Sequence, residues 1–197
     1  MSRVEIGVWD WGRPEWVASY YPSDLPVDWR PAYYANDYAC VGLPSSAWMP
    51  ADVSGWAEET GAHLCFWLGC GVRQLAVPEL VEHLYTLGSR LAGLVFEQVD
   101  ATTARGLMEA LKRAGVAPAQ AAEPPLPGIG APWRAEHPDR PGGVGLYRPR
   151  AEDDARKRRS LLEAFAAAPG PVDRCLLVDG PPAVVDECRQ LTQLLGL

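Results

Sequence analysis

Segments of strand character alternate with segments of helical character along this chain, and this alternation limits the fold more than any other feature. Apolar runs that suit strands occupy residues 4–8, 38–43, 63–71, 91–99, 144–148 and 174–178, with a further short strand expected at 117–123. Helical signals fall around residues 28–34, 52–60, 77–91, 102–114, 152–168 and 182–195. Strands and helices that alternate in this way predict a parallel sheet covered by helices.

The whole chain, residues 1–197, is expected to form one domain. A length of 197 residues with 48% hydrophobic and 22% charged residues is ordinary for one soluble globular unit. Prolines interrupt the pattern in the middle of the chain, at Pro118, Pro124, Pro125, Pro127, Pro132, Pro138 and Pro141. Because proline disrupts helices and central strands, we expect a proline-rich irregular insert at 117–142.

Composition and charge also argue against two kinds of binding partner, membranes and nucleic acids. No run approaches the roughly 18 apolar residues that span a bilayer, and the first residues lack the apolar stretch of a signal peptide, so a cytoplasmic protein without a membrane partner is expected. A net charge of −7 makes nucleic acid an unlikely general partner. The basic run at 156–159 follows acidic residues and suits a solvated helix face with i,i+4 pairs. A weaker hypothesis uses that run with Arg148 and Arg150 to bind nucleic acid.

The segment from Val4 to Trp16 combines the first strand with a turn that is rich in tryptophan. Trp9, Trp11 and Trp16 lie within eight residues of one another, beside turn-forming Asp10, Gly12 and Pro14. Indole rings are costly to expose, so these side chains either plug the end of the core or line the mouth of a pocket.

The five cysteines show no CxxC spacing, and their number is odd. Cys40, Cys65 and Cys175 lie inside apolar runs, so we expect small core residues in a reducing compartment. A metal site built from His63, Cys65 and Cys70 is disfavoured, because four residues separate the two thiols. No metal and no cofactor is predicted.

Several segments resemble the YecE-like family, also called domain of unknown function 72. The family's opening strand reads like IGTSGWSYPEW, and this chain matches it at Ile6, Gly7, Trp11, Pro14, Glu15 and Trp16. Further similarity occurs around 21–50, 56–60, 88–98 and 175–191, while the middle of the chain is hardly covered. The resemblance implies an α/β fold, a TIM-like (β/α) barrel that is incomplete or distorted, with about seven parallel strands.

The chain departs from the family at the carboxyl ends of strands, where such barrels carry their chemistry. The family's polar residues are replaced by Gly42, Pro44, Gly69, Glu97, Asp179 and Gly180. We therefore expect a divergent barrel of unknown activity that serves as a non-catalytic binding or assembly subunit. Its binding residues would be Trp9, Trp11, Trp48 and Arg148, and its partner a protein, a second copy of the chain or a small molecule.

The alternative is a small-molecule enzyme, hydrolase-like or isomerase-like. Asp10, Glu97 and Asp179 follow predicted strands, so their carboxylates would meet at one edge of a parallel barrel. Two of them could serve as general acid and base, or hold a divalent cation. Against this stands helix capping, for which Asp100 is also well placed. No P-loop, GxGxxG or HExxH motif is present.

Overall fold

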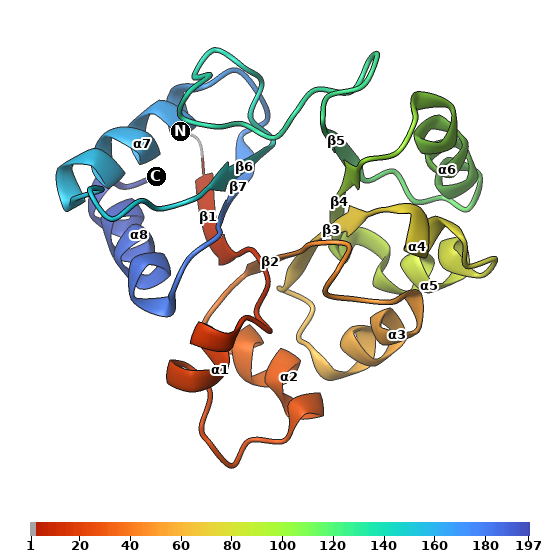
Figure 1. Ribbon diagram of the computed structural model, residues 1–197, viewed down its shortest axis with the longest axis horizontal. Helices are drawn as coiled ribbons and strands as arrows, with labels where there is room; N and C mark the ends of the chain where they lie inside the picture. The colour runs from red at the N-terminus through yellow and green to blue at the C-terminus, as the bar shows by residue number, and fades with distance from the viewer. Residues whose placement is uncertain (1–2) are drawn as a thin grey trace.

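Seven parallel strands follow one another around an open ring in the computed structural model, which describes residues 3–197 (Figure 1). Their bounds are β1 (Arg3–Val8), β2 (Cys40–Leu43), β3 (Cys65–Cys70), β4 (Leu91–Glu97), β5 (Ala119–Glu123), β6 (Val144–Tyr147) and β7 (Asp173–Val178). They form a three-stranded sheet in the order β1-β7-β6 and a four-stranded sheet in the order β2-β3-β4-β5. Met1 and Ser2 of the predicted domain lie outside the described residues.

The two sheets meet where β1 passes β2. Trp9 forms a parallel bridge with Gly42, and the backbone N–H of Asp10 donates to the Gly42 carbonyl at 2.8 Å. Gly42 permits this approach, because a Cβ at that position would lie 2.3 Å from the Trp9 ring. The strands therefore follow the spatial order β6-β7-β1-β2-β3-β4-β5.

The proline-rich segment links the two outer strands of this series. At one end, the N–H of Ala122 on β5 donates to the Gly130 carbonyl at 2.9 Å. At the other end, the N–H of Trp133 donates to the Val144 carbonyl of β6, and the N–H of Leu146 donates back to the Trp133 carbonyl, both at 2.9 Å. Within residues 3–197 no regular strand closes the ring. The predicted fold class is confirmed: α/β, with seven parallel strands in an incomplete barrel.

Helices cover the outside of the ring (Figure 1). They are α1 (Pro14–Ser19), α2 (Arg30–Ala35), α3 (Pro50–Glu59), α4 (Val72–Leu75), α5 (Leu80–Leu87), α6 (Ala101–Arg113), α7 (Ala155–Ala167) and α8 (Pro182–Leu195), with 3₁₀ turns at Val27–Trp29 and Gly88–Arg90. Asp100 caps α6 through the N–H groups of Thr102 and Thr103. No helix within the described chain is long and apolar enough to cross a membrane.

Apolar side chains form one core between strands and helices and a smaller one inside the ring. Trp9 belongs to the inner core together with Trp67, whereas Trp11 and Trp48 belong to the outer one. Trp9, Trp11 and Trp48 are 7%, 8% and 2% exposed. Of the two interpretations of the early tryptophans, the core plug is therefore the correct one. None of these three side chains offers a surface to a partner.

Two cysteines form a disulfide that the sequence does not predict. Cys40 on β2 and Cys175 on β7 are joined, although 135 residues separate them. The expectation of unpaired core cysteines is thus wrong for this pair. The strand order is the physical reason, because it places β2 and β7 on either side of β1 with both side chains in the inner core.

Candidate functional site

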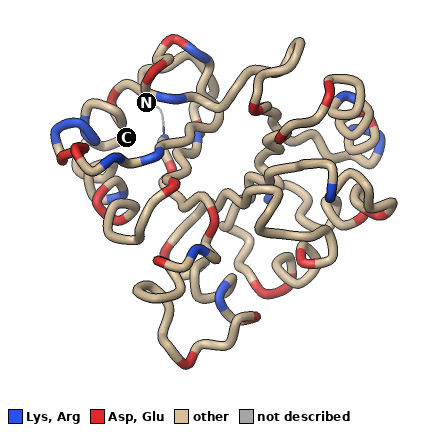
Figure 2. Tube along the Cα trace, in the orientation of Figure 1, with Lys and Arg blue, Asp and Glu red and all other residues tan. Residues whose placement is uncertain are grey.

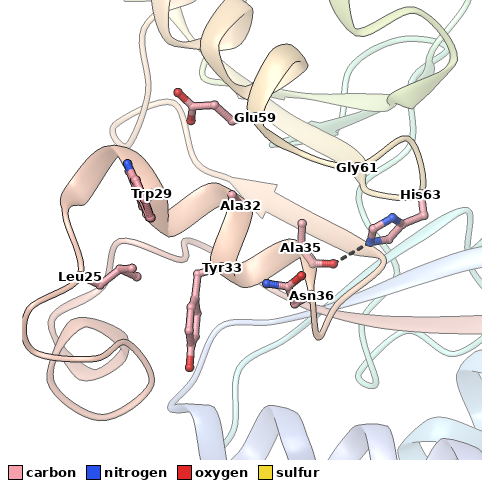
Figure 3. A pocket seen from close by; sticks show the side chains of 9 residues that line it. All are labelled: Leu25, Trp29, Ala32, Tyr33, Ala35, Asn36, Glu59, Gly61 and His63. Atoms are coloured by element: carbon pink, nitrogen blue, oxygen red, sulfur yellow. Dashed lines mark hydrogen bonds between the residues drawn. The ribbon is translucent and has the colours of Figure 1, made fainter.

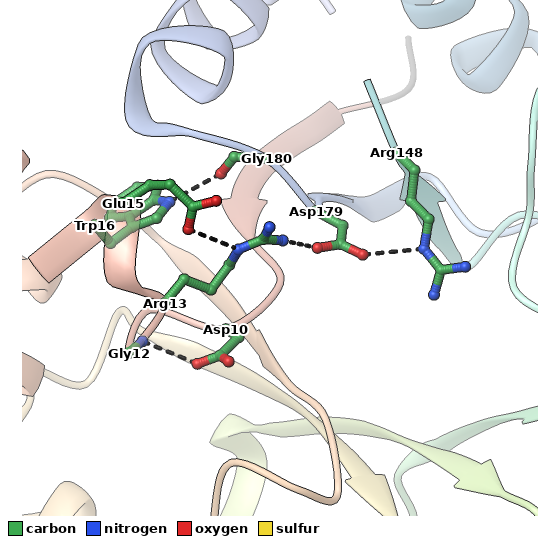
Figure 4. A network of polar contacts seen from close by, with 8 residues as sticks. All are labelled: Asp10, Gly12, Arg13, Glu15, Trp16, Arg148, Asp179 and Gly180. Carbon is green, nitrogen blue, oxygen red and sulfur yellow. Dashed lines mark hydrogen bonds and ion pairs between the residues drawn. The ribbon is translucent and has the colours of Figure 1, made fainter. Parts of the chain in front are cut away.

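Charged side chains from three neighbouring strands converge at the carboxyl ends of β6, β7 and β1 (Figure 4). Arg148 follows β6, Asp179 follows β7, and Arg13 lies in the turn between β1 and α1. Parallel strands end at the same edge of a sheet, so residues far apart in the sequence meet there. We call Arg13, Asp179 and Arg148 the arginine–aspartate triad.

The Asp179 carboxylate lies between the two guanidinium groups of this triad. Its Oδ1 accepts a hydrogen bond from Nη1 of Arg13, and its Oδ2 accepts from Nε of Arg148 at 3.0 Å. Arg13 also pairs through Nε with Glu15 at 3.5 Å. The Arg148 side chain is 59% exposed, and its two terminal amino groups have no partner among residues 3–197. They remain available to a ligand.

Backbone and indole hydrogen bonds fix the loop that carries Asp179. The N–H of Asp179 donates to the Tyr147 carbonyl at 2.8 Å. The buried indole of Trp16 donates from Nε1 to the Gly180 carbonyl at 3.0 Å. Because Trp16 belongs to α1, which begins at Pro14 directly after Arg13, one short helix positions both partners of the ion pair.

Asp10 lies beside the triad in an unusual backbone conformation. Its φ is 78°, a region that few residues other than glycine adopt, and its Oδ1 accepts from the Gly12 N–H at 2.9 Å. Burial raises the pKa of the Asp10 carboxyl, although Gly12 and Arg13 oppose that shift. Strained backbone and a raised carboxyl pKa both occur often at functional sites.

A buried hydroxyl group lies within electrostatic range of Asp10. Tyr21 is 5% exposed, and its Oη has no hydrogen-bond partner among residues 3–197. Burial raises the pKa of Tyr21, and the charge of Asp10 adds to that effect. An unsatisfied buried hydroxyl costs free energy, so this group is a candidate donor to a bound molecule.

Glu97 forms a separate contact on the other sheet. Its carboxylate accepts from the Ser45 hydroxyl at 2.6 Å and from the Ser45 N–H at 3.2 Å. The contact passes over Gly69 of the intervening strand, where a Cβ would lie 2.3 Å from Oε1 of Glu97. Glu97 thus reaches from β4 to the loop after β2, and within residues 3–197 no hydrogen bond joins it to Asp10 or Asp179.

The predicted trio of carboxylates is therefore divided. Asp10 and Asp179 flank Arg13, while Glu97 binds Ser45. Within residues 3–197 no group of three or more His, Cys, Asp or Glu side chains is arranged to hold a metal ion. Sequence reasoning missed Arg13, whose only signal is its place in the turn that follows the first strand.

Basic and acidic residues lie close together on and around α7 (Figure 2), and the basic ones mainly form ion pairs. Lys157 pairs with Asp153 and Arg159 with Glu163, both at i,i+4 spacing, as predicted for a solvated helix face. Arg158 pairs with a glutamate of α8.

A cavity lies away from the triad, beside α2 (Figure 3). Its volume is about 360 Å³, and it is lined by Leu25, Trp29, Ala32, Tyr33, Ala35, Asn36, Glu59, Gly61 and His63. Trp29 is 63% exposed and its neighbour Val27 is 70% exposed. His63 bonds the Ala35 carbonyl through Nε2 at 2.6 Å, which indicates a structural role for that imidazole.

Comparison with known proteins yields one structural likeness. No family model and no curated protein matches the chain. Among solved structures, a DUF72 family protein from Enterococcus faecalis V583 is similar, with 9% sequence identity, a TM-score of 0.48, and coverage of 100% of this chain and 99% of that one. The match names the family that the sequence resembles. The fold class itself follows from the strands and helices of this chain.

Proposed function

We propose that the protein binds a small anionic molecule, a carboxylate or a phosphate ester, at the carboxyl ends of β6, β7 and β1. The observation that carries this proposal is the exposed guanidinium of Arg148, which is held by Asp179 through Nε alone. Its two remaining amino groups form a planar fork that matches carboxylate and phosphate oxygens. Arg13, held by the same carboxylate, adds a second cation nearby.

Binding is favoured over turnover by the state of the carboxylates. Asp179 accepts from two arginines and Glu97 from Ser45, so each carboxylate already takes part in contacts that hold the structure together. A general base needs an available lone pair that faces the substrate. A non-catalytic binding protein is consistent with both contacts.

A thermal-shift experiment tests the proposal with inorganic phosphate and succinate as probes. The wild-type melting temperature is expected to rise more with either anion than with sodium chloride at equal ionic strength, since ligands that bind the folded state stabilise it. The specific part of the shift is expected to vanish in Arg148→Gln. Equal shifts in all three salts would contradict the proposal.

An enzyme remains a second candidate because of Asp10. Its carboxyl, whose pKa is raised by burial, is the candidate general acid or base of a hydrolase-like or isomerase-like reaction, and the Tyr21 hydroxyl is the candidate polarising group. Turnover of small ester or sugar substrates that is abolished in Asp10→Asn would support this candidate. Turnover that survives that substitution would remove Asp10 from it.

An assembly subunit would need a different contact surface from the one expected, because Trp9, Trp11 and Trp48 are buried. Val27 and Trp29 are exposed beside the α2 cavity, and we propose them as the place where a protein or a second copy would bind in a cytoplasmic setting. Light scattering on wild type and Trp29→Ser tests this idea. An identical monomer mass in both would remove the second copy.

A further inference from the structure

Three cysteines line one cavity at the amino-terminal ends of the strands, the end opposite the triad. The cavity has a volume of about 610 Å³, and its walls include Cys40, Cys65 and Cys175. Cys40 and Cys175 form the disulfide, and Cys65 carries a free thiol that is only partly buried. The other free cysteines, Cys70 and Cys188, are buried in the outer core.

Strand register brings the free thiol beside the disulfide. Cys65 on β3 is the register partner of Cys40 on β2, and neighbouring strands lie about 4.8 Å apart. Cys175 reaches Cys40 from the other direction, with a Cα–Cα distance of 6.9 Å across β1. Gly7 of β1 leaves room for this contact, because a Cβ there would lie 2.8 Å from Sγ of Cys40.

We propose that this cavity is a thiol–disulfide exchange site in which Cys65 attacks the disulfide at Cys40. The Cys65 thiol loses its proton, and the thiolate bonds to Sγ of Cys40. The Cys40–Cys175 bond breaks at the same time, and Cys175 leaves as a thiolate that takes up one proton. One disulfide and one thiol are present before and after the step, so no external oxidant or reductant is consumed.

The exchange changes which strands are covalently joined. The Cys40–Cys175 bond connects the two sheets across β1, whereas a Cys40–Cys65 bond lies within the four-stranded sheet. The sheet junction then depends on the backbone contacts of Gly42 with Trp9 and Asp10. Asp10 adjoins the triad, so the disulfide pairing at one end of the ring bears on the site at the other.

The surroundings of Cys65 set the rate at neutral pH. Burial and the Glu5 carboxylate raise the pKa of the Cys65 thiol, and the Arg90 guanidinium lowers it to a smaller extent. Other charged or titratable groups at the cavity are Arg3, His63, Asp173 and Arg174. Since only the thiolate attacks, exchange is slow at neutral pH and accelerates as pH rises.

Disulfide mapping by alkylation and mass spectrometry tests the proposal on the full chain. Wild-type protein is incubated at pH 7 and at pH 9 without added thiol, quenched with acid and alkylated. The Cys40–Cys175 peptide is expected to dominate at pH 7, and a Cys40–Cys65 peptide with alkylated Cys175 is expected to accumulate at pH 9. Absence of the Cys40–Cys175 peptide at pH 7, or of the Cys40–Cys65 peptide at pH 9, would overturn the proposal.

A variant tests the same contact independently. Cys175→Ser oxidised with diamide is expected to form mostly Cys40–Cys65, while the matched variant Cys188→Ser retains Cys40–Cys175. Fully alkylated Cys65 in folded, oxidised Cys175→Ser would also overturn the proposal. If that variant does not fold, the wild-type mapping decides.

Discussion

Arg148 donates from Nε to Oδ2 of Asp179 at 3.0 Å, and this contact holds an exposed guanidinium at the end of β6. In Figure 4 the two terminal amino groups point away from Asp179. An arginine held in this way loses less side-chain entropy on binding than a free one. The ion pair is thus interpreted as a support for ligand binding rather than a source of stability, since exposed ion pairs contribute little to the free energy of unfolding.

Trp16 is expected to stabilise the loop that carries Asp179. Trp16→Phe removes the donor to the Gly180 carbonyl and leaves a buried acceptor unsatisfied. The free energy of unfolding, measured in urea, should fall by about 1–3 kcal/mol. Trp29→Phe is the matched control, because Trp29 is 63% exposed and should change stability by less than about 0.5 kcal/mol. Equal effects of the two substitutions would contradict the role of Trp16.

Gly93 is expected to tolerate no side chain. A Cβ at this position would lie 2.1 Å from the Trp67 ring in the inner core, so Gly93→Ala should destabilise the protein by about 1–3 kcal/mol through overpacking. Gly106→Ala is the control, because a Cβ at this position of α6 would meet nothing within 4 Å. Alanine favours a helix over glycine, so this substitution should raise the free energy of unfolding by about 0.5–1 kcal/mol. Chemical denaturation of both variants measures whether the free energy of unfolding falls in Gly93→Ala and rises in Gly106→Ala.

Asp10 should make the protein less stable as pH rises, because its pKa is raised in the folded state. Its folded-state pKa is raised above the ordinary value of 3.8, so folding favours the protonated form, and this contribution is lost as pH rises through the folded-state value. Asp10→Asn keeps an acceptor for the Gly12 N–H and tolerates the positive φ. It should therefore raise the melting temperature at pH 7, with a gain that shrinks as pH falls through the raised folded-state value towards 3.8. A constant gain at every pH would argue against a buried, ionised Asp10.

Asp153 should make the free energy of unfolding depend on pH in the opposite direction, because its pKa is lowered in the folded state. Burial raises its pKa, but hydrogen bonds from Lys157, the Arg150 N–H and the Tyr147 hydroxyl outweigh that effect and lower the pKa to about 2. Its stabilisation is present above the ordinary value of 3.8 and is lost as pH falls towards about 2. Asp153→Asn should thus cost about 1.5–3 kcal/mol at pH 7 and much less at pH 2. Denaturation at both pH values measures this difference.

The strands could be predicted from the sequence more closely than the helix starts. Apolar runs locate six of the seven strands, because strands that are largely buried leave a clear apolar pattern. The remaining strand, β5, reads AQAAE and is half-exposed, so the sequence predicts it only as a short strand at 117–123. The helices expected from residues 28 and 52 begin at Arg30 and Pro50 instead, each with a proline in its first turn. Asp52 therefore lies inside α3, where its carboxylate accepts from the Met49 N–H. The short helices α1 and α4 have too few turns to show a period.

The candidate site was only partly predictable. Strand ends indicated Asp10, Glu97, Asp179 and Arg148, since side chains there meet at one edge. The division of these residues between two contacts depends on Arg13 and Ser45, which belong to loops without a regular pattern. The Cys40–Cys175 disulfide was hidden for a similar reason, because its pairing depends on the spatial order of strands rather than on spacing.

Isothermal titration calorimetry with inorganic phosphate and succinate tests the central claim, anion binding by Arg148, most directly. Wild type and Arg150→Gln should bind at least one anion with affinities equal within about twofold, because the Arg150 side chain is exposed and its guanidinium pairs with Glu136. Arg148→Gln should lose about tenfold or more, the value of one charge-assisted contact. Absence of binding in wild type, or equal affinity in Arg148→Gln, would contradict the account.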